Sequence, residues 1–275
     1  MASRNPILLV LALGLTLTAC ATGGASTSAP SSSSLPSLPS PTPSVAAAPS
    51  VSARPSRTAV PSPTYPANIE DVPGDDFSPL EVETYFIEPD ATDIQVFYTI
   101  PAEGWLGWIG TFKPEQGTDT PYQLVGMSIV NVTNVVQHGC TMHAAADPPV
   151  GPTVDDMAAA LAALSPFILT KPPSGVVFDG FSGKYLELTV PDLALQVTGD
   201  DTAFTDCTAG ELNSWIGEPL GYAFYGYSHP GQVEEIWLLD VDGTRLMIEA
   251  IWSPGSPEGD VAELRSILDS IDIVP

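Results

Sequence analysis

The hydrophobic and polar positions divide the chain into three zones. An apolar run of eleven residues, ILLVLALGLTL, covers 7–17. Residues 21–67 then hold 13 Ser and 10 Pro and scarcely any large apolar side chain. From residue 68 onward, β-branched and aromatic residues recur in short runs separated by turn residues, which is typical of strands. We therefore expect a signal peptide over 1–19, a Cys20-led linker over 20–67 and a globular domain over 68–275.

Eight runs in the third zone predict strands and two segments predict helices. The first helix, 154–164, has Thr153 as N-cap and Asp156 completing a variant of the capping box. The second, 258–271, has Ser256 as cap candidate and Pro257 at its first helical position. The strands cover 82–87, 94–100, 105–112, 122–132, 183–190, 222–227, 234–241 and 244–252.

The last two strands predict a hairpin with a defined register. Asp242-Gly243 between apolar runs favours a two-residue type I′ turn. Paired residue numbers then sum to 485, which places Asp240 opposite Arg245 as an expected ion pair. Both faces of the second strand are apolar, so we expect a sheet covered on both sides. The predicted fold class is α+β, a mainly antiparallel sheet with two helices packed on it as a sandwich.

The first two zones are typical of a displayed lipoprotein. The apolar run is shorter than the roughly 20 residues that cross a bilayer as a helix and has the layout of a secretory signal. Leu17-Thr18-Ala19-Cys20 resembles the lipobox of bacterial lipoproteins, here of actinobacterial type. The resemblance implies diacylation of Cys20 and anchoring on the extracytoplasmic face of the cell membrane. The alternative is a secreted protein with an incidental Cys20. The Ser/Pro-rich linker predicts a disordered, extended stalk.

Charge narrows the choice of partner. All 33 acidic residues lie at or after Glu70, beside five lysines and arginines, so residues 68–275 carry a net charge of −28. Such a surface excludes nucleic acid as a partner because nothing neutralises its phosphates. It favours neutral or cationic ligands. We expect a monomer that contacts the membrane through the lipid on Cys20 and binds an envelope or extracellular partner.

A second resemblance concerns the domain. The segment Ile100-Pro101-Ala102-Glu103-Gly104-Trp105 resembles a strand end of PsbP-like domains in bacterial surface lipoproteins. The closing hairpin and helix, within 240–271, are similar to theirs. The resemblance implies a fold and supplies no catalytic residue.

The cysteines predict a crosslink. Once Cys20 is lipidated, Cys140 and Cys207 form an even pair in an exported chain, which favours a disulfide; the alternative is two free thiols. His138 and His143 flank Cys140 and suggest a metal site or a Cys/His catalytic pair. A disulfide removes the thiolate that either role needs, so we expect no metal and no cofactor.

Other acidic patterns have simpler interpretations. Asp240, Asp242 and Glu249 imitate part of an EF-hand loop, but the flanking segments are predicted strands, so the turn explains these residues better. Glu234 and Glu235 cannot share a site because strand neighbours point to opposite faces.

Aromatic residues supply the candidate binding surface. They are dense in 222–229, and the set we select comprises Trp215, Tyr225, Tyr227 and His229. The alternative is an ordinary packed aromatic strand. No phosphate loop, serine-hydrolase elbow or His-Glu-x-x-His motif occurs, so no catalytic residue is assigned. The leading hypothesis is a non-catalytic binding domain displayed on a stalk. The competing one is an extracytoplasmic hydrolase whose site is assembled from scattered residues.

Overall fold

The computed structural model describes residues 67–69, 78–114, 124–198, 201–218 and 229–275. They belong to one compact unit, Ala59–Pro275. The predicted signal peptide, almost all of the predicted linker and the predicted strand 222–227 lie outside the described residues. Within the described residues, no helix has the length and apolar character needed to cross a bilayer.

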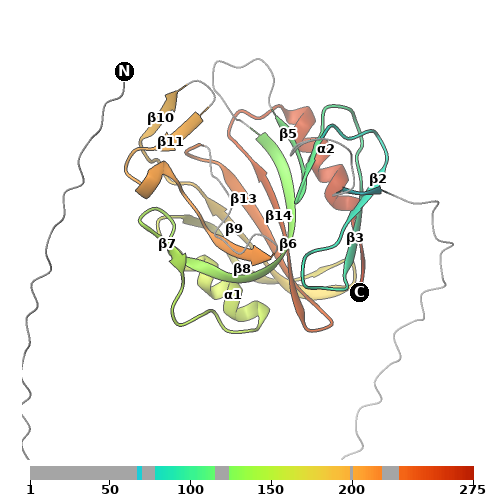
Figure 1. The fold of residues 1–275 in the computed structure, drawn as a ribbon, viewed down its shortest axis with the longest axis horizontal. Helices are drawn as coiled ribbons and strands as arrows, with labels where there is room; N and C mark the ends of the chain where they lie inside the picture. Colours follow the sequence, from blue (N-terminus) through green and yellow to red (C-terminus); the bar gives the residue numbers. More distant parts are fainter. Residues whose placement is uncertain (1–66, 70–77, 115–123, 199–200, 219–228) are drawn as a thin grey trace, which may run out of the picture. The chain divides into compact units, whose positions relative to one another are not determined.

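Nine strands of the described part of the chain form a central sheet (Figure 1). Its order is β4-β5-β6-β14-β13-β9-β8, and β7 and β12 also pair with β6. Every pairing in it is antiparallel. The strands are β4 (Leu106–Trp108), β5 (Gly110–Pro114), β6 (Leu124–His138), β7 (Met142–Ala145), β8 (Ile168–Phe178), β9 (Phe181–Thr189), β12 (Trp215–Glu218), β13 (Val233–Val241) and β14 (Thr244–Trp252).

The remaining described elements pack around this sheet. A smaller sheet has the order β1-β2-β3-β15, and β10 pairs with β11 as a separate hairpin. These elements are β1 (Ala67–Asn68), β2 (Thr84–Ile87), β3 (Gln95–Thr99), β10 (Leu195–Thr198), β11 (Asp201–Phe204), β15 (Asp272–Val274), the short 3₁₀ helix η2 (Thr208–Gly210), α1 (Val154–Ala162) and α2 (Glu258–Asp269).

The two α-helices lie on opposite sides of the central sheet (Figure 1). On one face, Met157 and Leu161 of α1 pack against sheet residues such as Ile236. On the other face, α2 and the smaller sheet cover residues such as Ile248. Burial of both faces explains why β14 is apolar at six of its nine positions. The predicted α+β fold with a mainly antiparallel sheet and two covering helices is confirmed.

The predicted start of α1 is confirmed and that of α2 is partly wrong. Thr153 accepts a hydrogen bond from the Asp156 amide at 3.1 Å, and the Asp156 carboxylate accepts one from the Thr153 amide at 3.1 Å. The carboxylate also accepts a hydrogen bond from Thr153 Oγ1 at 2.6 Å, and this bond, followed by the one from the Thr153 amide, lowers the Asp156 pKa. At α2, the N-cap is Pro257, which has no side-chain cap bond. Ser256 instead accepts a hydrogen bond from the Ser253 amide, which closes the preceding turn.

The β13–β14 hairpin has the predicted register, but its predicted ion pair is wrong. Asp240 pairs with Arg245 along the backbone, and Asp242 and Gly243 have φ of +50° and +91°, as a type I′ turn requires. The Asp240 carboxylate accepts a hydrogen bond from the Gly243 amide. Arg245 turns away from it and donates to carbonyl oxygens of other segments. The turn therefore stabilises this end of the hairpin, and a cross-strand ion pair does not.

Two features of the central sheet differ from the prediction because they depend on contacts between distant segments. The predicted strand 105–112 is split into β4 and β5, which pair with each other, so that Trp108 lies opposite Gly110. A Cβ at Gly110 would lie 2.1 Å from the Met127 carbonyl oxygen, so only glycine allows β5 this close to β6. Strand β8 was not predicted because Pro172 and Pro173 interrupt its pattern. As the last strand in the sheet order, it tolerates prolines that lack an amide donor.

Candidate functional site

The structure corrects the predicted binding surface. Trp215 lies at the start of β12 and is 0% exposed. Its pairing with Val135 of β6 places the indole in the apolar layer under α1, so its assignment to an exposed surface is wrong. His229 is also buried and is not at the edge of an open face. Tyr225 and Tyr227 lie outside the described residues, and their assignment stays a prediction.

Two buried acidic residues, Glu234 and Glu249, lie next to each other near Trp215. Glu249 of β14 lies opposite Ile236, and Glu234 of β13 lies opposite Ile251. In an antiparallel pair this makes the two glutamates diagonal neighbours on one face. Glu249 is 0% exposed and Glu234 is 1% exposed. Two carboxyl groups thus lie inside the apolar layer between the sheet and α1.

Glu249 is held by neutral donors. Its Oε1 accepts a hydrogen bond from Trp215 Nε1 at 3.1 Å, and the Ser128 side chain also bonds to it. No N–H or O–H group of the described residues donates to Oε2. The Glu249 carboxyl also lies within hydrogen-bonding distance of Glu234, and this contact becomes a hydrogen bond only when one of the two carboxyls carries a proton.

The surroundings of Glu249 favour its neutral form. Burial raises its pKa well above the ordinary range, and the charge of Glu234 raises it further. Hydrogen bonds from Trp215 and Ser128 act in the opposite direction and are the smaller effects. Two ionised carboxylates in one apolar layer repel each other strongly, so Glu249 retains its proton at pH values where exposed glutamates are ionised.

Glu235 provides a contrast within the same strand. It points to the opposite face, as strand alternation predicts, and is also buried. There it forms an ion pair with Arg265 of α2, accepts a hydrogen bond from Tyr185 Oη at 2.9 Å and lies 3.8 Å from Lys171 Nζ. Its charge is compensated by these partners, whereas the surroundings of Glu249 favour the neutral form of that carboxyl group.

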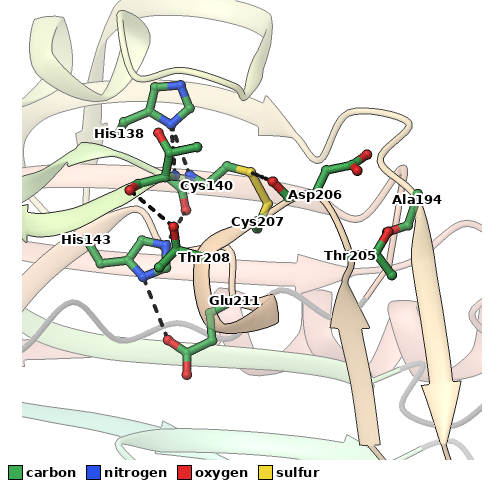
Figure 2. Close-up of a disulfide and its surroundings, with 11 residues drawn as sticks. His138, Cys140, His143, Ala194, Thr205, Asp206, Cys207, Thr208 and Glu211 are labelled. Atoms are coloured by element: carbon green, nitrogen blue, oxygen red, sulfur yellow. Dashed lines mark hydrogen bonds and ion pairs between the residues drawn. A yellow bond between two sulfur atoms is a disulfide. The ribbon is translucent and has the colours of Figure 1, made fainter. Parts of the chain in front are cut away.

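The disulfide region is a second cluster of polar groups (Figure 2). Cys140, beside β7, is bonded to Cys207, which precedes η2, so the predicted disulfide is present. His138 Nδ1 accepts hydrogen bonds from the amides of Cys140 and Thr141, each at 3.2 Å. In this arrangement the histidine stabilises the turn at the disulfide and the cysteines are unavailable as thiolates.

His143 lies on the other side of the same turn. Its Nε2 is 3.1 Å from the Gly139 carbonyl oxygen, and its Nδ1 is 3.8 Å from the Glu211 carboxylate. Figure 2 shows its ring directed toward Glu211 and away from His138. Among the residues that the structure describes, no three side chains of the metal-binding types come together.

The proximity of Glu234 and Glu249 was not predicted, although the predicted hairpin register implies it. The predicted register, with paired numbers summing to 485, already places the two residues on one face. What it could not supply was the burial of that face near Glu249, which depends on β12 folding back onto β6.

The comparisons with known proteins identify no relative. No family model and no curated protein matches the chain. Among solved structures, it is similar to the crystal structure of LpqN, involved in cell envelope biogenesis of Mycobacterium tuberculosis. The identity is 11%, the match covers 73% of this chain and 91% of that chain, and the TM-score is 0.29. At this TM-score the likeness supports no inference about the present chain.

Proposed function

We propose that this chain is a lipid-anchored extracytoplasmic protein whose acidic domain binds an envelope or extracellular partner without catalysing a reaction. The observation that carries the proposal is the Cys140–Cys207 disulfide, taken together with the signal peptide predicted over 1–19 and the lipobox-like Leu17–Cys20. Such crosslinks form and persist in oxidising compartments. Lipid on Cys20 and the Ser/Pro-rich stalk would hold the domain outside the membrane.

Binding is favoured over catalysis by the placement of the carboxyl groups. A hydrolase needs an acid and a base within reach of substrate. In the described residues, Glu249 is the carboxyl group whose pKa its surroundings raise well above the ordinary range, and both it and its neighbour Glu234 are at most 1% exposed. A buried pair of this kind fits a structural or proton-linked role better than substrate attack.

The partner is expected to be neutral or cationic. The net charge of −28 over residues 68–275 repels anionic lipid and polymers. Tyr225 and Tyr227 are the candidate contact residues, on the strength of the sequence alone. Tyrosine offers a large contact area with few rotatable bonds, which suits recognition of sugar rings or peptide side chains.

Two experiments test the two halves of the proposal. For anchoring, detergent phase partitioning of the full-length protein should place the wild type and Ser28→Ala in the detergent phase. Cys20→Ala should be in the aqueous phase or retain its signal. Unchanged partitioning of Cys20→Ala would contradict lipidation.

For binding, isolated cell-wall sacculi stripped of their anionic polymers serve as the probe, because the acidic domain is expected to be repelled by those polymers. The wild type should sediment with the sacculi, and Tyr225→Ala combined with Tyr227→Ala should weaken this. Val177→Ala, at a residue 69% exposed on β8, is the matched control and should sediment like the wild type. Equal sedimentation of the double variant and the wild type would exclude the tyrosines as contacts. Absence of wild-type sedimentation would refute wall binding.

A further inference from the structure

We propose that a neutral carbohydrate chain binds to the central sheet at β8, β9 and β13, on the face that α2 and the smaller sheet cover only in part. The inference rests on the proposed function, since it names a ligand class for the binding domain, but its residues are independent of Tyr225 and Tyr227. The residues that form this sugar site are Lys171, Tyr185, Glu187, Glu235, Trp237 and Arg265.

The aromatic residues of the sugar site are accessible, although the opposite face of the same strands is closed. Leu186 of β9 and Ile236 of β13 point toward α1 and are 0% exposed. Their chain neighbours Tyr185 and Trp237 point the other way, because side chains alternate along a strand, and both are only half-buried. Ile248, which pairs with Trp237 from β14, is again 0% exposed under the covering elements. Aromatic surface is therefore open where this cover ends.

Tyr185 and Trp237 form one continuous aromatic surface. They are paired directly across β9 and β13, with ring centroids 5.2 Å apart and ring planes at 49°. Phe178 of β8 extends this surface, with its ring centroid 5.7 Å from that of Trp237. Tyrosine and tryptophan combine a large apolar ring face with a polar O–H or N–H at the edge. Such rings match the apolar C–H faces of sugars, and three neighbouring rings can contact more than one sugar of a chain.

A network of polar side chains adjoins these rings. Glu235 of β13 pairs directly with Glu187 of β9. Lys171 Nζ lies 2.6 Å from the Glu187 carboxylate and donates to Tyr185 Oη at 3.2 Å. Tyr185 Oη donates in turn to Glu235 at 2.9 Å, and Arg265 of α2 binds the same carboxylate. Because each side chain is held by its neighbours, the groups are positioned before a ligand arrives, which lowers the entropic cost of binding.

The exposure of the charged groups favours a neutral ligand. The side chains of Lys171 and Arg265 are 53% and 40% exposed, whereas those of Glu187 and Glu235 are 13% and 8% exposed. The cations thus form an accessible rim that repels a cationic ligand, and the net charge of −28 over residues 68–275 repels an anionic one. Hydroxyl groups both donate and accept hydrogen bonds, so sugar hydroxyls can bond to the cations and to the carboxylates.

Two facing glutamates are also found in glycoside hydrolases, but the surroundings of this pair suit binding. Hydrolysis needs one carboxyl group that carries a proton for the leaving sugar. Burial raises the pKa of Glu187, but hydrogen bonds from Lys171 and Thr170 outweigh it, so the pKa is lowered. Glu235 forms an ion pair with Arg265. Both glutamates are therefore held as carboxylates, which accept hydrogen bonds from sugar hydroxyls and have no proton to give.

Isothermal titration calorimetry of the full-length protein, in micelles of a detergent without a sugar headgroup, tests the sugar site. The probes are three neutral hexasaccharides, namely chitohexaose, cellohexaose and maltohexaose. The wild type should bind at least one of them with a Kd below about 1 mM, and binding of none would overturn the proposal. Trp237→Ala should weaken this binding at least about tenfold, and Lys171→Met at least about threefold.

Lys184→Met is the matched control for Lys171→Met. Lys184 precedes Tyr185 on β9, but it points to the opposite face and binds Asp155 at the start of α1, so its replacement should leave the affinity unchanged. Unchanged affinity in folded Trp237→Ala or in Lys171→Met would overturn the proposal. If Trp237→Ala does not fold, Lys171→Met alone decides.

A cationic probe tests the choice of a neutral ligand. At about 0.15 M salt, charges more than about 8 Å away are largely screened, so the rim formed by Lys171 and Arg265 dominates. The hexamer of glucosamine should therefore bind more weakly than the best neutral hexasaccharide, and tighter binding would overturn the proposal.

The outcomes separate the sugar site from the proposed function. Sedimentation of the wild type with the stripped sacculi, without binding of any hexasaccharide, would overturn the sugar site and leave the proposed function standing. Hexasaccharide binding without sedimentation would support the sugar site and contradict wall binding.

Discussion

Among the lysines and arginines of the domain, Arg245 is the residue whose replacement should lower the free energy of unfolding most. Its guanidinium donates to the carbonyl oxygens of Val132 at 3.0 Å, Thr133 at 2.8 Å, Gly151 at 2.7 Å and Thr153 at 3.3 Å. One side chain thereby joins β14 to β6 and to the N-terminal end of α1. Arg245→Met removes all four bonds and keeps most of the apolar stem, so it isolates the contribution of the charged head.

The cost can be worked from these contacts. A hydrogen bond that involves a charged group contributes about 1.5–3 kcal/mol when buried. Several of the four carbonyls can bind water once the guanidinium is gone, and burial of the Arg245 charge, which lowers its pKa, already offsets part of the gain. We therefore expect Arg245→Met to lower the free energy of unfolding by about 2–4 kcal/mol. Arg245→Lys, a single-point donor, should recover less than half of the loss.

Urea denaturation followed by circular dichroism measures this cost. Asp240→Asn is the matched control, since asparagine keeps an acceptor for the Gly243 amide and removes the charge opposite Arg245; it should change the free energy of unfolding by less than about 0.5 kcal/mol. A double-mutant cycle should find no coupling between the two positions. A loss below about 0.5 kcal/mol in Arg245→Met, or coupling above about 1 kcal/mol, would contradict this role of Arg245.

Three further predictions concern stability. Gly243→Ala should cost about 1 kcal/mol in urea denaturation, from backbone strain alone, because φ is +91° and no atom lies within 4 Å of the added Cβ; an unchanged midpoint would contradict the turn. Replacing both Cys140 and Cys207 by Ser should cost about 4 kcal/mol for a separation of 67 residues, and equal stability to the oxidised wild type would argue against the crosslink. Because the pKa of Glu249 is raised, its ionisation lowers the stability of the wild type as pH rises. The melting temperature of Glu249→Gln minus that of the wild type should therefore increase from acid to alkaline pH. Glu235→Gln should have a lower melting temperature than the wild type at neutral pH. A change of the same sign in both variants would contradict the different environments of the two glutamates.

Local chemistry explains what could be predicted from the sequence. Asp242-Gly243 has few conformational choices, so turn type and register followed from two residues. The side chain of each of Thr153 and Asp156 accepts a hydrogen bond from the amide of the other. These bonds do not depend on distant segments, so the start of α1 could also be predicted from the sequence.

Long-range packing explains what could not be predicted. Trp215 resembles an exposed aromatic until β12 pairs with β6 and places it under α1. Arg245 has a natural partner in Asp240 by register, but four carbonyls from distant segments outcompete one exposed carboxylate. The burial of Glu249 likewise depends on elements far apart in the sequence, although its diagonal relation to Glu234 was already contained in the hairpin register.

The most direct test of extracytoplasmic, lipid-anchored display is mass spectrometry of the mature protein extracted from membranes under non-reducing conditions. The account predicts an N-terminal peptide that begins at Cys20 with a diacylglyceryl group on its sulfur, and a peptide pair joined through Cys140 and Cys207. An unmodified Cys20, whether inside an uncleaved chain or in a product cleaved elsewhere, would contradict it.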